Sequence, residues 1–251
     1  MRIDPKAFAP TTALACAIIL ACESPPLRDP CPNGALEGDT TVSSQGELEE
    51  IARHTAIRGD LTISCPGCDD LTDLECVESV NGVLSIEGTD HLPSLVGLDS
   101  LAEAGSLVID DNASLASLAA LASLETSLGC LDIVYNGSLS DLTGLEGVAS
   151  VENDAKIFHN TGLETVSGLG GLTAIGGSLE IHDNPDLADL DGLGSLKSVG
   201  GQLRIFDNPA LSDCEVCELL DALEGMPTTL MVVSNLGDEC TPVPSGCPGW
   251  H

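Results

Sequence analysis

The chain has 251 residues, with 40 acidic and 8 basic side chains, so its formal net charge at pH 7 is -32. An electrostatic field of that sign repels nucleic acids and anionic surfaces, so we expect no nucleic acid as a partner. Two explanations of the acidic excess stay open: solubility of a leucine-rich chain, or binding of calcium or of a cationic partner.

The amino-terminal segment is predicted to direct export and to tether the protein. Arg2 and Lys6 precede an apolar run, residues 13–21, that is too short to span a bilayer as a stable helix. We therefore interpret residues 1–21 as a signal peptide. Residues 22–30 are Pro-rich and too few to fold, so we expect them to form a tether.

The apolar run ends in ILAC at residues 19–22, which resembles the lipobox of bacterial lipoproteins, where the cysteine becomes the lipidated first residue. This resemblance implies lipidation at Cys22 and attachment to a membrane through that lipid. The residue after this cysteine is Glu23 rather than an aspartate, which resembles lipoproteins that double-membraned bacteria send to the outer membrane. We therefore expect an exported protein of the cell envelope, anchored in the outer membrane. The alternatives are an ordinary signal peptide cleaved nearby and lipidation at Cys16.

Residues 31–60 are predicted to cap the amino-terminal end of the fold. Ser44 and, three residues later, Glu47 match a capping box in front of the segment GELEEIARH, so a short helix is expected there. A stacked-repeat fold needs such a cap, because an open end would expose core leucines and an unpaired strand edge.

Residues 61–212 consist of imperfect copies of one unit, which reads GSLEIHDNPDLADLDGLGSLKSVGG at residues 177–201. In this unit, leucine and isoleucine flank one polar residue, as in a strand with one buried face, and apolar residues then recur every three positions. An eighth strand is expected around Val232. The central isoleucines of the copies recur at a nearly constant spacing, at Ile63, Ile86, Ile109, Ile133, Ile157, Ile181 and Ile205.

A repeat of this length cannot bury its own apolar face and must stack on copies of itself. The predicted fold is therefore a repeat solenoid, a parallel β-helix with about eight turns of 23–24 residues. An asparagine follows most central isoleucines by three residues, at Asn112, Asn136, Asn160, Asn184 and Asn208. We interpret this column as structural, because each amide can satisfy backbone groups of its turn and the equivalent asparagine of neighbouring turns.

Three segments carry a resemblance to a known family: the unit G-x-L-x-I-x-x-N-x-x-L, the CPNG at residues 31–34 and the FDNPALSDC at residues 206–214. They resemble receptor L domains, the leucine-rich-repeat-like ligand-binding lobes of insulin-receptor and growth-factor-receptor ectodomains, which also occur in bacterial surface lipoproteins. The resemblance covers about residues 31–240. It implies a right-handed helix of parallel strands with short helical or coiled sides, and a domain that binds rather than catalyses.

Cysteine placement predicts disulfides at both ends of the solenoid, as in other exported chains. Residues 213–251 form the expected Cys-rich carboxy-terminal cap and tail, and each cap should hold two disulfides, with three connectivities open for each. The rival is zinc held by the two C-x-x-C pairs, which is disfavoured because those pairs lie at opposite ends. Cys130 is left over, as a free thiol or an intermolecular link. The cap cysteines are Cys31, Cys65, Cys68, Cys76, Cys214, Cys217, Cys240 and Cys247.

Two columns of residues flank the central isoleucines and should point out from the sheet. Cross-strand pairing between equivalent side chains explains both columns without a ligand. An exposed apolar stripe beside alternating charges is also the character of a contact surface, so these residues are the candidate binding face for a protein or a glycan. They are Val134, Phe158, His182 and Phe206 after the isoleucines, and Lys156 and Arg204, which alternate with Asp132 and Glu180, before them.

The sequence holds no nucleophile motif, phosphate loop or metal-ligand cluster, so we predict no enzyme activity, no metal and no cofactor. Acidic residues beside the asparagine column leave calcium as an alternative, although they do not follow the calcium-loop templates. The predicted function is a non-catalytic surface lipoprotein for recognition or adhesion. The alternatives are a purely structural envelope lipoprotein and, least favoured, a β-helix enzyme that cleaves polysaccharides.

Overall fold

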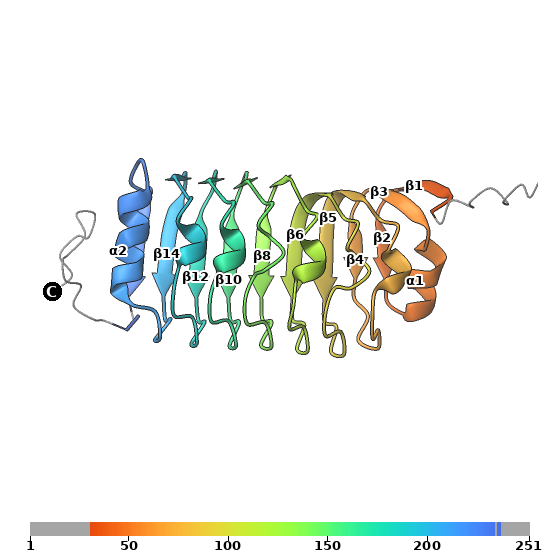
Figure 1. The fold of residues 1–251 in the computed structure, drawn as a ribbon, viewed down its shortest axis with the longest axis horizontal. Coiled ribbons are helices and arrows are strands. Elements are labelled where there is room, and N and C mark those ends of the chain that lie inside the picture. Colours follow the sequence, from red (N-terminus) through yellow and green to blue (C-terminus); the bar gives the residue numbers. More distant parts are fainter. Residues whose placement is uncertain (1–30, 234, 237–251) are drawn as a thin grey trace, which may run out of the picture.

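The isoleucine column of the sequence forms one continuous parallel sheet in the computed structural model, which describes residues 31–233 and 235–236 (Figure 1). Ile157 pairs with Ile133 on one side and with Ile181 on the other. Because these partners are equivalent residues of successive repeats, each copy of the repeat adds one strand in the same direction. The prediction of a solenoid-like stack of parallel strands is therefore confirmed.

The larger sheet has 11 strands, and every pair of neighbours in it is parallel. Its path runs β1-β3-β5-β6-β8-β10-β12-β14-β15, with β2 and β4 paired beside it. The strands are β1 (Asn33–Glu37), β2 (Thr40–Val42), β3 (His54–Arg58), β4 (Leu61–Ile63), β5 (Ser79–Glu87), β6 (Glu103–Asp110), β8 (Leu131–Val134), β10 (Ala155–Phe158), β12 (Leu179–His182), β14 (Gln202–Phe206) and β15 (Thr229–Val233).

The return path of each repeat carries short elements of its own. A second parallel sheet, in the order β13-β11-β9-β7, pairs two-residue strands, and one-turn 3-10 helices form where apolar residues are spaced by three. A 3-10 helix has three residues per turn, so this spacing places its leucines on one side. The elements are β7 (Ser127–Leu128), β9 (Ser150–Val151), β11 (Ala174–Ile175), β13 (Ser198–Val199), η1 (Thr72–Leu74), η2 (Ala119–Leu121), η3 (Ser167–Leu169) and η4 (Asp191–Leu193).

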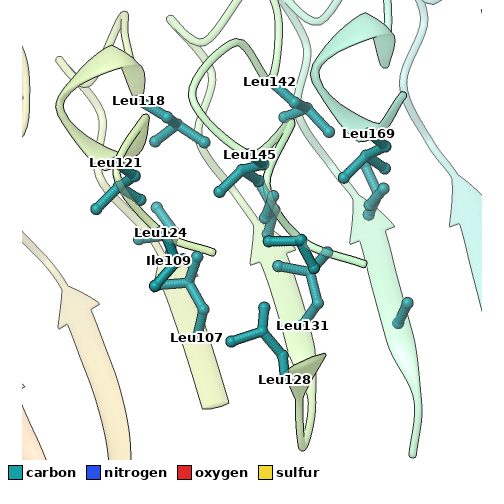
Figure 2. Packing of buried hydrophobic residues seen from close by; sticks show 14 of the residues in the cluster. Leu107, Ile109, Leu118, Leu121, Leu124, Leu128, Leu131, Leu142, Leu145 and Leu169 are labelled. Carbon is teal, nitrogen blue, oxygen red and sulfur yellow. The ribbon is translucent and has the colours of Figure 1, made fainter. Parts of the chain in front are cut away.

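The core is a continuous column of leucine, isoleucine and valine between the large sheet and the return path. Leu107 and Ile109 on β6 face Leu121 and Leu124 of the same repeat (Figure 2). All four side chains are fully buried. Burial of one such side chain contributes about 1.5–3 kcal/mol, so the stacked leucines are the main source of stability.

The amino-terminal cap contains the expected helix, α1 (Gln45–Ile51), but the capping-box prediction is wrong in its detail. The Ser44 side chain makes no capping hydrogen bond. Glu47 instead accepts from the backbone N–H of Ser43 at 2.6 Å and from its hydroxyl at 2.8 Å. Ser44 has the extended backbone that is usual at an N-cap, and the Glu47 carboxylate bonds one residue further back than in a capping box.

The amino-terminal cap contains two disulfides: Cys31–Cys76 joins segments 45 residues apart, and Cys65–Cys68 closes a local loop. The four cysteines predicted for this cap thus pair among themselves, and the second bond leaves no thiolate at that C-x-x-C pair for zinc. On α2 (Asp213–Ala222), which follows β14, Cys214 and Cys217 are also disulfide-bonded.

The predicted signal peptide, the tether and the lipidated Cys22 all lie outside the described residues, as do Cys240 and Cys247. Their assignments therefore stay predictions. Within the described ranges, no helix combines the length and the apolar character needed to cross a membrane.

The asparagine column forms a buried hydrogen-bonded ladder along the edge of the sheet. Asn160 is fully buried, and its Nδ2 donates to the carbonyl of Ile133 at 2.9 Å. Its backbone N–H donates to Oδ1 of Asn184 at 3.0 Å, while its own Oδ1 accepts from the backbone N–H of Asn136 at 2.9 Å. The structural interpretation of this column agrees with these bonds, because each amide satisfies backbone groups of neighbouring turns.

We predict that Asn160→Ala lowers the free energy of unfolding by about 2–4 kcal/mol, because it leaves buried backbone groups of Ile133 and Asn136 without partners. Urea denaturation followed by circular dichroism measures the change. Asn153→Ala is the matched control, since the side chain of this exposed asparagine donates to the Gly129 carbonyl at 3.1 Å and lies outside the ladder. An equal loss in both variants would show that the ladder has no special role.

Candidate binding face

The outward side of the large sheet carries the residues predicted to form the binding face. Along β10, Ala155 and Ile157 are buried, whereas Lys156 and Phe158 alternate with them and stay partly exposed. The same alternation holds on β12 and β14. Equivalent outward side chains therefore stand in columns that run across the strands.

Three rings of the first column stack on one another. The Phe158 and His182 ring centroids are 4.5 Å apart with an interplanar angle of 8°, and those of His182 and Phe206 are 4.4 Å apart at 11°. These distances match the spacing of adjacent strands, about 4.8 Å, so the register of the sheet itself stacks the rings. The column continues with Val233 on β15, which is 46% exposed.

Val134 does not belong to the exposed stripe as predicted, because it is only 7% exposed. In the sheet register it lies between Asp110 on β6 and Phe158 on β10. Val134 is thus flanked by the two neighbouring strands at this position. The exposed part of the apolar column therefore begins at Phe158.

The two basic residues of the face are paired with carboxylates on adjacent strands. Lys156 Nζ is 3.3 Å from Asp132, and an Arg204 guanidinium nitrogen is 3.1 Å from Glu180. Partial burial lowers the pKa of Lys156, but the nearby carboxylate of Asp132 outweighs it and the pKa is raised overall. Arg204 also lies over the Phe206 ring, 5.4 Å from its centroid. Cross-strand pairing of the alternating charges is thus confirmed.

Two further aromatic residues, Tyr135 and His159, join this group and were missed in the sequence. Their rings stack at 4.6 Å, and both contact Phe158 edge to face. They occupy the position directly before the buried asparagine, where the backbone is left-handed, with φ of 58° and 57°. Asp111, Asp183 and Asp207 hold the same position in other turns. These residues form a second column, two positions after each central isoleucine, and this spacing is the sequence signal that could have revealed Tyr135 and His159.

A shallow groove of about 480 Å³ lies next to these rings, at the carboxyl ends of the strands. Each of three consecutive turns contributes two residues to the groove lining: the one with the left-handed backbone and the one two positions after it. His182 Nδ1 and His159 Nδ1 lie 2.7 Å and 3.8 Å from the Asp183 carboxylate, so the groove adjoins the aromatic stack. The lining residues are His159, Thr161, Asp183, Pro185, Asp207 and Pro209.

The face is strongly acidic on the amino-terminal side of the aromatic group. Partial burial raises the pKa of Asp110, and the negative charges of Asp111, Glu87 and Asp132 add to this effect. One carboxylate oxygen of Asp110 and one of Asp132 are buried without a hydrogen-bond partner among the described residues. The fold therefore holds negative charge here at a cost in stability.

No cluster of three or more His, Cys, Asp or Glu side chains in the described part of the chain is arranged to hold a metal ion. Cys130 is a half-buried free thiol, and its backbone N–H donates to the Ser106 hydroxyl at 3.0 Å.

A scan against models of protein families found no match to this chain, and a search of curated proteins found none either.

We predict that Asp110→Asn raises the free energy of unfolding by about 0.5 kcal/mol at neutral pH, a value kept small because water still screens this carboxylate. The pKa of Asp110 is raised in the folded protein, so the ionised group destabilises the fold at pH values above that pKa. The gain should fade as the pH falls and vanish below the ordinary carboxyl value of 3.8. Urea denaturation across pH measures this, with the exposed Asp69→Asn as control; a gain independent of pH would contradict it.

Proposed function

We propose that this chain is a non-catalytic recognition or adhesion module of an exported, lipid-anchored envelope protein, and that it binds a protein or a glycan through the outward face of its parallel sheet. The observation that carries the proposal is the stack of Phe158, His182 and Phe206 on that face. The three side chains are only partly covered, in a chain in which Phe, Trp and Tyr together make up 2%.

A pre-stacked group of rings suits binding for an energetic reason. Ordering of flexible side chains is one of the main costs of association. The stack and the flanking ion pairs already hold these side chains in one arrangement, at centroid distances of 4.4 Å and 4.5 Å. A partner that covers the face would therefore gain apolar burial with little loss of side-chain entropy.

We further propose that the fold is of the receptor L-domain type, a right-handed solenoid of about eight turns. In-register pairing between equivalent residues of successive repeats and the row of 3-10 helices on the return path support this. Export with a lipid at Cys22 is the placement we propose for the protein, in the outer membrane. The disulfides of the amino-terminal cap support an exported chain, because such bonds persist in oxidising compartments.

A purely structural envelope lipoprotein is the second candidate, and one observation favours it. The rings stack on one another, and the charged side chains beside them form ion pairs across strands. Both columns would then serve only to hold the solenoid in register.

The test is a capture experiment from envelope extract with the protein immobilised through its amino-terminal end. We compare it with the triple variant Phe158→Ser, His182→Ser, Phe206→Ser. A binding face predicts that at least one partner is retained by the unaltered protein and reduced about tenfold or more by the variant, because such aromatic side chains dominate interfaces.

The matched control replaces two exposed apolar residues elsewhere, Val96→Ser and Met226→Ser, which are 50% and 65% exposed. This control should retain the partner. Circular dichroism confirms that each variant is folded. If the unaltered protein and the triple variant capture the same background, the recognition function is wrong and the structural function is the better explanation.

A further inference from the structure

We propose that the groove at the carboxyl ends of β10, β12 and β14 binds a short, extended and basic segment of a partner protein, with Tyr135 at one end of the site. This inference rests on the proposed recognition function, and it names the chemistry of the partner and a second contact region beside the aromatic stack.

The shape of the groove favours an extended chain. Its lining repeats in three consecutive turns, as His159 with Thr161, Asp183 with Pro185, and Asp207 with Pro209. Because turns are about 4.8 Å apart, three of them span roughly 10 Å, which is the length of three or four residues of extended polypeptide. The groove runs across the strands, so a linear ligand can contact all three turns.

The charge of the groove selects a cation. Asp183 and Asp207 line it, and no lysine or arginine does. Asp207 is exposed, and no hydrogen bond or ion pair to its carboxylate is found in the described part of the chain. The lysine and arginine of the outward face, Lys156 and Arg204, are engaged by Asp132 and Glu180. His182 and His159 lie beside the Asp183 carboxylate, whereas no basic side chain is found beside that of Asp207 in the described part of the chain, so a cationic ligand would be attracted and an anionic one repelled.

The apolar surfaces of the site suit the side chains of lysine and arginine. Pro185 and Pro209 offer flat aliphatic walls beside the two carboxylates, and such side chains combine an aliphatic stem with a charged head. One face of the Tyr135 ring is covered by His159, yet the side chain is 51% exposed. A cation placed on its other face would lie over an aromatic ring.

A protein segment fits these features better than a glycan does. A neutral sugar can donate hydroxyl hydrogen bonds to the two carboxylates but cannot neutralise their charge, and an acidic sugar is repelled. A basic segment is also drawn in by the whole chain, because its formal net charge is -32.

The test measures binding of a fluorescein-labelled (Lys-Ser)5 peptide to the full chain by fluorescence anisotropy in 150 mM salt. The double variant Asp183→Asn, Asp207→Asn should weaken binding about tenfold, and Tyr135→Asn about threefold. Asparagine tolerates the left-handed backbone at all three positions, so these variants keep the local fold. The matched control, Glu125→Gln with Glu152→Gln, removes two exposed charges on the amino-terminal side of the strands and should change affinity less than twofold.

Equal losses in the groove variant and the control would overturn the proposal, because binding would then follow net charge alone. Binding of cellohexaose that the groove variant abolishes, with no binding of the basic peptide, would assign the groove to a glycan and also overturn it. The two proposals can be distinguished. If a partner is lost by the Phe158, His182 and Phe206 triple variant but kept by the groove variant, the recognition function stands and this inference is refuted.

Discussion

The asparagine ladder is the constraint on which the rest of this structure depends. Each amide bridges three turns, since Asn160 bonds to Ile133 in one direction and to Asn184 in the other. A buried amide can satisfy these groups only if the turn before it reverses direction at a fixed place. The residue preceding each asparagine therefore adopts a left-handed backbone, whether it is aspartate, tyrosine or histidine. The ladder thus sets both the register of the sheet and the position of its carboxyl edge.

Because of this register, residues that recur once per repeat line up in columns on the surface of the sheet. Side chains that are one repeat apart in the sequence stand side by side, about 4.8 Å from one another. That distance suits stacked rings and cross-strand ion pairs, and both occur on the outward face. A single substitution in the repeat changes only one step of a column, so a solenoid can vary its face without altering its core. The acidic and the aromatic parts of this face are successive stretches of the same columns.

Electrostatics decides what such a face can bind. The chain carries a large negative charge. On this face the basic side chains of Lys156 and Arg204 form ion pairs with carboxylates of neighbouring strands. Carboxylates such as those of Asp110 and Asp207 remain without ion-pair partners in the described structure. A partner that brings positive charge relieves their mutual repulsion, whereas an acidic partner increases it. The proposed selectivity for basic ligands thus needs no loop or cofactor, because it would follow from which charges the strands pair.

The sequence by itself determined the stack of parallel strands, because Ile133, Ile157 and Ile181 share one period and each repeat must bury its apolar residues on its neighbours. It also determined the asparagine ladder and the columns of the outward face. Only the tertiary structure decided that Val134 is covered, that Tyr135 and His159 join the rings, and which cysteines of the first cap pair. Periodicity assigns a side chain to a face, but its exposure and partners depend on the size and position of neighbours contributed by other turns.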